Sequence, residues 1–173
     1  MHTSNLWTRA LCFDLGDTIM IEETEVKDAT ETTQRADLIP GMAGLLQDLK
    51  AHGYRLALVA DSKAYTPINV LRQHDLLDLF DTLAISEVVG VSKPAPEMFQ
   101  AALEALRVPK TDYARCVMVG NNLERDIVGA NRLGLISVFF HWNERRRTQP
   151  LTEDERPDYE VHSVEGIRTT LKK

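Results

Sequence analysis

The chain has 173 residues, of which 43% are hydrophobic and 27% charged, and its formal net charge is -6. This length and balance suit a single globular domain with a hydrophobic core. The negative charge argues against a nucleic-acid-binding or anionic-membrane-binding surface, and no apolar stretch is long enough to cross a bilayer. Residues 1–7 lack a basic segment followed by an apolar core, so we expect no signal peptide and a cytoplasmic location.

Predicted strands and helices alternate along the chain, which is typical of an α/β fold with three layers, a doubly wound and mostly parallel sheet between two layers of helices. Strands are predicted at 9–14, 56–60, 82–86, 115–119 and 136–140, and a short one near 159. Helices are predicted at 42–53, 66–74, 94–106 and 123–133, and from about 163 to 171. We therefore predict one domain over residues 1–173.

Two segments lack apolar periodicity. Residues 22–37 are polar and acidic, which predicts an exposed and mobile loop or a short solvated helix. Residues 141–158 are charged and interrupted by proline, which predicts a loop. The two cysteines, Cys12 and Cys116, fall instead within predicted buried strands, where we expect packed free thiols.

The segment 11–18 is an apolar run that ends in Asp14, a glycine and Asp17. Open α/β sheets bind ligands outside the carboxyl ends of their strands, so an acid at this strand end is a candidate nucleophile or metal ligand. The alternative is a turn aspartate that caps the next segment.

Two further loops follow predicted strands. Asp61 and Ser62 could offer backbone N–H groups and a hydroxyl to a phosphate-like group, or could simply cap the next helix. Lys93 precedes a proline-rich turn and could neutralise an anion in the crevice, although most lone lysines lie on the surface.

The fourth loop follows the strand predicted at 115–119. Asn121 could offer its amide oxygen to a hard cation, and Asp126 could orient it. The alternative is a helix N-cap made by Asn121 or Asn122. All four loops lie at the carboxyl edge of the predicted sheet and would form one site.

Together these four segments resemble the haloacid dehalogenase-like (HAD) hydrolase superfamily: Phe13 to Thr18, Leu56 to Ser62, Val91 to Phe99 and Val119 to Ile127. They occur in the order that the family shows, and the resemblance extends from about residue 9 to residue 171. It implies the family's Rossmann-like α/β fold and a hydrolytic activity.

The resemblance also implies roles for individual residues. Asp14 matches the aspartate that attacks phosphorus and becomes an aspartyl-phosphate, and Lys93 matches the lysine that steadies the nucleophile and the phosphate. Magnesium is the implied cofactor, with Asp14, the Gly16 carbonyl and Asn121 as its ligands and Asp126 as the supporting acid.

Three positions depart from the family's pattern. Gly16 stands where a second aspartate usually protonates the leaving group, which puts about 10²–10⁴-fold of general acid–base catalysis at risk. Asp17 is adjacent and could substitute only if Gly16 bends the chain, since neighbouring side chains of an extended segment point apart. Ala60 replaces a phosphate-binding hydroxyl, although Ser62 lies close by, and Asn121 replaces a magnesium-binding carboxylate.

Only residues 19–39 remain for the cap that family members often insert after the first motif, so we expect a vestigial cap or a mobile loop. Such an open site suits large or protruding phosphorylated substrates, or completion of the pocket by another copy in a homo-oligomer. The leading interpretation is a magnesium-dependent phosphohydrolase with weakened activity. One alternative is a catalytically silent binding or regulatory domain. The other is a 2-haloacid dehalogenase-type hydrolase, which also lacks the second acid but needs a dry, enclosed pocket.

Overall fold

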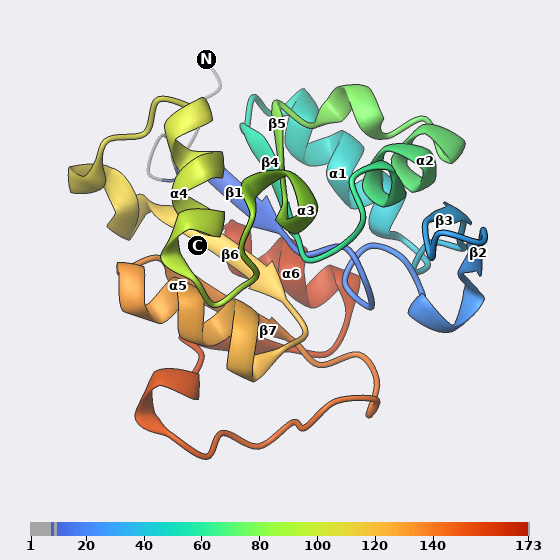
Figure 1. Cartoon of the computed structure of the whole chain (residues 1–173). Coiled ribbons are helices and arrows are strands. Elements are labelled where there is room, and N and C mark those ends of the chain that lie inside the picture. Colours follow the sequence, from blue (N-terminus) through green and yellow to red (C-terminus); the bar gives the residue numbers. More distant parts are fainter. Residues whose placement is uncertain (1–7, 9, 173) are drawn as a thin grey trace.

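The computed structural model describes residue 8 and residues 10–172, so the predictions for residues 1–7 and Arg9 lie outside the described part. Its centre is a six-stranded sheet in the order β5-β4-β1-β6-β7-β8, in which every neighbouring pair is parallel (Figure 1). The strands are β1 (Ala10–Phe13), β4 (Leu56–Ala60), β5 (Thr82–Ile85), β6 (Cys116–Gly120), β7 (Ile136–Phe140) and β8 (Tyr159–Val161). The helices are α1 (Met42–Ala51), α2 (Tyr65–Gln73), α3 (Ser86–Val89), α4 (Pro96–Ala105), α5 (Val128–Leu133) and α6 (Val164–Leu171).

Alternate residues of the central strands face opposite helix layers, as the period of two in a strand requires. Leu11 and Phe13 of β1 belong to the apolar cluster formed with α1, α2 and α6. Ala10 and Cys12 belong to the cluster formed with α4 and α5. Both faces of the sheet are therefore covered, and the predicted three-layer α/β fold is confirmed.

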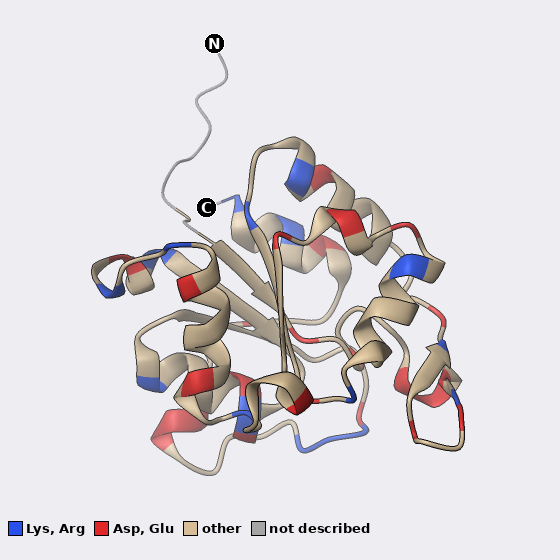
Figure 2. Ribbon diagram, turned by 45° about the horizontal axis from the view of Figure 1, so that its top comes forward, with Lys and Arg blue, Asp and Glu red and all other residues tan. Residues whose placement is uncertain are grey.

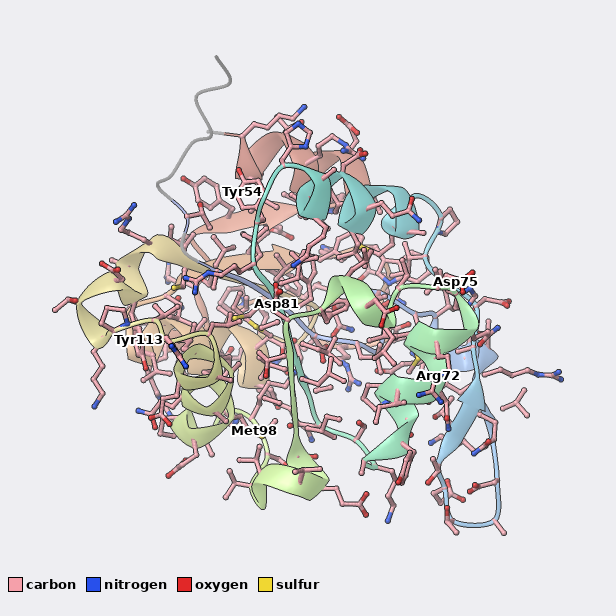
Figure 3. The ribbon with its side chains drawn as sticks, turned by 90° about the horizontal axis from the view of Figure 1, so that it is seen from above. Tyr54, Arg72, Asp75, Asp81, Met98 and Tyr113 are labelled. Atoms are coloured by element: carbon pink, nitrogen blue, oxygen red, sulfur yellow. The ribbon has the colours of Figure 1, made fainter. Side chains whose placement is uncertain are left out.

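Helix α4 shows how the sequence pattern selects a buried face. Its buried residues Met98, Phe99, Ala102 and Leu103 lie on one side of the helix, and Pro96 occupies the start of the helix, where its missing N–H costs nothing. Met98 and Tyr113 pack in the same apolar cluster and are labelled in Figure 3. The helix is thereby fixed over the face of the sheet opposite α1.

The segment 22–37 differs from the prediction of a loop or a short solvated helix. After one turn of 3₁₀ helix (Glu22–Thr24) it forms an antiparallel pair of strands, β2 (Val26–Lys27) and β3 (Thr33–Arg35), and this hairpin contacts α2. The backbone N–H of Thr33 donates to Thr66 Oγ1 at 3.0 Å, and Asn69 donates to the Thr33 carbonyl at 3.0 Å. The prediction was wrong because tertiary hydrogen bonds to α2 replace the apolar pattern that a strand normally needs.

The remaining differences are local. The helix predicted at 123–133 begins as a π-helical turn (Leu123–Ile127) before α5, and the loop 141–158 contains a 3₁₀ turn (Glu153–Glu155). Acidic and basic residues are interspersed over the outer parts of the ribbon (Figure 2). Within the described residues, no helix has the length and apolar character needed to cross a membrane.

The predicted free thiols of Cys12 and Cys116 are present, and both are buried. Burial raises the pKa of the Cys12 thiol to about 12 and that of Cys116 to about 11. At neutral pH both thiols therefore stay protonated. Because the thiolate is the reactive form of cysteine, the two residues act only as small apolar side chains in the core.

Candidate active site

The candidate site lies where the order of the strands reverses. The chain runs from β1 through β4 to β5 on one side, and then crosses to β6 on the other side of β1. Such a reversal opens a crevice outside the carboxyl ends of the strands. A cavity of about 720 Å³ occupies this position, and its lining includes Asp14, Ala60, Ser62, Lys93, Asn121 and Asp126. The four loops singled out in the sequence therefore converge on one cavity.

Lys93 joins two of these loops through its side chain. Its Nζ lies 2.8 Å from Asp14 Oδ1, 2.7 Å from Asp126 Oδ1 and 2.7 Å from the Val59 carbonyl. Burial alone would lower the pKa of Lys93, but the carboxylates of Asp126 and Asp14 outweigh it and hold the pKa above its usual value. The lysine is therefore a fixed positive charge beside Asp14, as predicted, and not a surface residue.

Asp126 is fully buried, and its carboxylate also accepts a hydrogen bond from the Asn122 backbone N–H at 3.1 Å. Burial raises the pKa of this carboxyl, the nearby Asp14 adds to the rise, and Lys93 opposes it. A Cβ on Gly120 would lie 2.2 Å from Asp126 Oδ2, so only glycine at the end of β6 leaves room for the acid. The end of β6 is thus built around the Asp126–Lys93 pair.

Three oxygen atoms meet beside Asp14. The Asn121 side-chain oxygen lies 3.1 Å from Asp14 Oδ2 and 3.3 Å from the Gly16 carbonyl, with no donor among them; turning the amide over would let its nitrogen donate to both. Oxygens separated by about 3 Å are neighbouring ligands of an octahedral Mg²⁺, whose bonds are about 2.1 Å long. With the amide oxygen of Asn121 in this orientation, the predicted ligand set of Asp14, Gly16 and Asn121 fits a magnesium ion.

The predicted phosphate-binding loop also lines the cavity, but several of its groups already have protein partners. The Asp61 carboxylate accepts from the Lys93 backbone N–H at 2.9 Å and lies 3.3 Å from an Arg125 guanidinium nitrogen. The Ser62 N–H donates to Ser86 Oγ at 2.9 Å. Asp61 thus holds the Lys93 loop in place, and Ala60 contributes a buried methyl group to the wall.

The Asp17 side chain lies outside the lining of the cavity. It is fully buried, adopts a left-handed backbone conformation with φ 50°, and is not among the lining residues. Its Oδ1 accepts from the Glu22 N–H at 3.0 Å, and its Oδ2 lies 2.9 Å from Arg145 Nε. The left-handed turn at Asp17 directs its side chain toward the loop 141–158, so the geometry gives no support to its predicted catalytic role.

Glu22 is the site residue that the sequence interpretation missed. A Cβ built on Gly16 would lie 2.3 Å from Glu22 Oε1 and 2.9 Å from its Cδ. The Glu22 carboxylate therefore occupies the space that a side chain at position 16 would take, and it also lines the cavity. In the sequence, Glu22 is one of several acids in the polar segment 22–37. Nothing in that pattern distinguishes it from a solvent-exposed acidic residue.

Two arginines of the loop 141–158 reach this carboxylate. Arg146 lies 2.9 Å from Glu22 Oε1 and Arg145 lies 3.3 Å from Glu22 Oε2. Arg146 also lines the cavity. The loop that was predicted from charge and proline content thereby completes the wall of the site.

Comparisons with known proteins agree with this geometry. The chain matches the family of hydrolases described as haloacid dehalogenase-like hydrolase over residues 6–134. It is 33% identical over 106 residues to a glyceraldehyde 3-phosphate phosphatase from Pyrococcus abyssi, an alignment that spans 61% of this chain and 43% of the relative. It is also 33% identical over 135 residues to the pyrimidine 5'-nucleotidase YjjG from Escherichia coli, spanning 78% of this chain and 57% of the relative. The chain spans about half the length of the curated relatives that it matches.

Solved structures share the fold. A HAD phosphatase from Thermococcus onnurineus superposes with a TM-score of 0.77 at 21% identity, over 95% of this chain and 98% of that one. The L-2-haloacid dehalogenase from Xanthobacter autotrophicus superposes with a TM-score of 0.73 at 14% identity, over 95% of this chain and 98% of that one. At these identities the two structures establish the architecture alone.

Proposed function

The chain belongs to the haloacid dehalogenase-like hydrolases, and we propose that it is a magnesium-dependent phosphohydrolase that acts through an aspartyl-phosphate on Asp14. The observation that carries the proposal is the buried Lys93 ammonium, held between Asp14 and Asp126 at 2.8 and 2.7 Å. It fixes one oxygen of Asp14 and leaves the other facing the cavity's Asn121. The names of the curated relatives, phosphatases and a nucleotidase, support the same chemistry.

Asp14, the Gly16 carbonyl and Asn121 would hold the magnesium ion, with Asp126 in support through Lys93 and Asn122. When bound, the ion supplies positive charge that offsets the charge on the transferred phosphoryl group. Asn121 carries no charge, so we expect weaker magnesium binding than a second carboxylate ligand at this position would give.

In the first half of the proposed reaction an Asp14 oxygen attacks phosphorus, the phosphorus–oxygen bond to the leaving group breaks, and a proton passes to that leaving oxygen. In the second half water attacks the phosphorus, giving up a proton, and releases Asp14 and inorganic phosphate. Lys93 stabilises the negative charge in both halves. Glu22 is the carboxyl group placed to give and take the proton, because it fills the space beside Gly16.

A catalytically silent binding domain is the second candidate; it rests on Gly16, Ala60 and Asn121 in place of an acid, a hydroxyl and a carboxylate, and the phosphatase names of the relatives speak against it. Haloacid dehalogenation receives less support, since a cavity of about 720 Å³ lined by many charged residues is not a dry pocket. The substrate is proposed to be a phosphorylated molecule, in keeping with the names of the curated relatives. The same proposal includes a cytoplasmic location and a single domain in which residues 19–39 form a reduced cap. It also includes a second copy of the chain that closes the open site.

The test is phosphate release from a panel of phosphate esters, with and without Mg²⁺, for the wild type and for Asp14→Asn. The matched control is Asp75→Asn, an exposed residue with φ 57° at the end of α2, where asparagine is equally tolerated (Figure 3). We expect magnesium-dependent turnover in the wild type and the control and none in Asp14→Asn. Equal activity in all three proteins, or ligand binding without turnover, would refute the phosphohydrolase proposal.

A further inference from the structure

A second group of metal-ligating side chains lies outside the cavity, where β7 and β8 end. The two strands are parallel with Phe140 opposite Val161, and the His141 N–H donates to the Val161 carbonyl at 2.9 Å. The next residues, His141 and His162, are therefore neighbours across the strands, with ring centroids 5.0 Å apart. Glu160 lies beside them, and one donor atom from each of the three residues falls within 4.8 Å of the others.

The hydrogen bonds around the two histidines leave one nitrogen of each ring directed at Glu160. His141 Nε2 lies 2.7 Å from Glu144 Oε1 and His141 Nδ1 lies 3.0 Å from Glu160 Oε1, so a metal bound at Nδ1 would leave the Nε2 N–H to donate to Glu144. His162 Nδ1 lies 3.2 Å from the His141 carbonyl, and its Nε2 lies 3.9 Å from the same Glu160 oxygen. Metal-bound histidines almost always donate their second N–H to a carboxylate or a backbone carbonyl, and both rings here have such a partner.

We propose that His141 Nδ1, His162 Nε2 and a Glu160 oxygen form a binding site for a divalent transition metal of the Zn²⁺ type. Two imidazoles and a carboxylate suit Zn²⁺ and its neighbours and not Mg²⁺, which prefers oxygen ligands. Three protein ligands leave the fourth tetrahedral position to water. The site is separate from the proposed magnesium site, since none of its residues lines the cavity.

Of the three donors, His141 is held in place before any metal arrives. The His141 ring stacks on Phe139 with centroids 5.6 Å apart, and its side chain is only 16% exposed. Carboxylate oxygens of Glu144 and Glu160 lie 2.7 and 3.0 Å from the two nitrogens of this ring and place negative charge beside it. The same negative surroundings attract a dication, and fixed donors reduce the entropy lost on binding.

Binding here would fasten the start of the loop 141–158 to the end of β8. Arg145 and Arg146, which contact Glu22 at the cavity, follow His141 within the same loop. The metal would therefore hold the root of the segment that completes the cavity wall, without contacting the cavity itself.

The experiment is a calorimetric titration of the protein with ZnCl₂ in excess Mg²⁺, which keeps Zn²⁺ from the oxygen-rich site. We expect one equivalent bound by the wild type, and loss of that equivalent in His162→Ala, whose 67% exposed side chain can be removed without disturbing the fold. Glu144→Gln should weaken binding about 10–100-fold through the His141 ring. The control is His52→Ala, an exposed histidine on the last turn of α1.

Cobalt substitution gives an independent readout, because tetrahedral Co²⁺ absorbs visible light and the octahedral ion hardly does. No binding by the wild type, or the same binding by the wild type and His162→Ala, would overturn the proposal. Loss of the equivalent in Asp14→Asn but not in His162→Ala would also overturn it, by assigning the zinc to the magnesium site. None of these outcomes depends on turnover, so the result is separate from that of the phosphohydrolase test.

Discussion

Replacement of Glu22 by glutamine removes the one carboxyl group that fills the space beside Gly16. The change keeps the size of the side chain and one oxygen that can accept from Arg145 or Arg146, but it removes the second oxygen and the ability to carry a proton. General acid–base catalysis is worth about 10²–10⁴-fold, so we expect turnover of an alkyl phosphate to fall by a factor in that range.

The assay compares two leaving groups in the same protein. An alkoxide needs a proton as it leaves, whereas p-nitrophenolate leaves without one, so Glu22→Gln should slow alkyl phosphate much more than p-nitrophenyl phosphate. The exposed neighbour Glu23 provides the control variant Glu23→Gln. An equal loss on both substrates would indicate a structural role, and no loss on either would refute the assignment of Glu22.

A rescue variant sharpens the comparison. A Cβ at position 16 would lie 2.3 Å from Glu22 Oε1, so the two side chains compete for one space. Gly16→Asp combined with Glu22→Ala returns an acid to that space from the other segment. We expect the double variant to regain activity on alkyl phosphate that Glu22→Ala alone lacks; failure to regain it in a folded protein would count against the reasoning.

Two predictions concern stability. A Cβ on Gly44 in α1 meets nothing within 4 Å, whereas one on Gly129 in α5 would lie 2.2 Å from the Phe99 ring. In urea unfolding, Gly44→Ala should stabilise the protein by about 0.5–1 kcal/mol and Gly129→Ala should destabilise it by about 1–3 kcal/mol. An unchanged unfolding midpoint in Gly129→Ala would contradict the close packing of α4 on α5. Hydrogen bonds from Arg147 and from the Leu151 N–H lower the pKa of Glu155 from 4.5 to about 2, so the stability that this pair contributes is complete above about pH 4.5 and is lost as the pH falls toward 2. The stability difference between the wild type and Arg147→Ala should therefore shrink between pH 5 and pH 2, and a constant difference would contradict it.

The fold followed from the sequence wherever burial sets the pattern. The strand β4 is a continuous apolar run, β7 is apolar except for Ser137, and the four buried positions of α1 repeat at helical spacing, so the place of these elements could be predicted from local sequence. The hairpin β2–β3 could not, because all its residues except Val26 are polar and its position depends on hydrogen bonds between Thr33 and α2.

The site divides in the same way. Asp14 and Lys93 each lie in a short motif that follows a predicted strand. Because the strands of the sheet are parallel, the sequence predicted that both residues lie at the same carboxyl edge. Glu22 returns to Gly16 only after the chain turns at Asp17, and Arg146 arrives from the far end of the sequence. Such contacts depend on the path of loops, which local patterns do not determine.

The link between Glu22 and the loop 141–158 has a consequence for the conditions under which the site is complete. Its contacts are charge pairs, and the Arg145 and Arg146 side chains are 44% and 39% exposed. Salt shortens the range of such interactions to about 8 Å at physiological ionic strength and to about 3 Å at 1 M, whereas the buried Lys93 cluster is shielded from it. The contacts of Glu22 with Arg145 and Arg146 are therefore sensitive to ionic strength, while those of Lys93 with Asp14 and Asp126 are not. A change in salt concentration would act on the cavity wall and leave the catalytic pair in place.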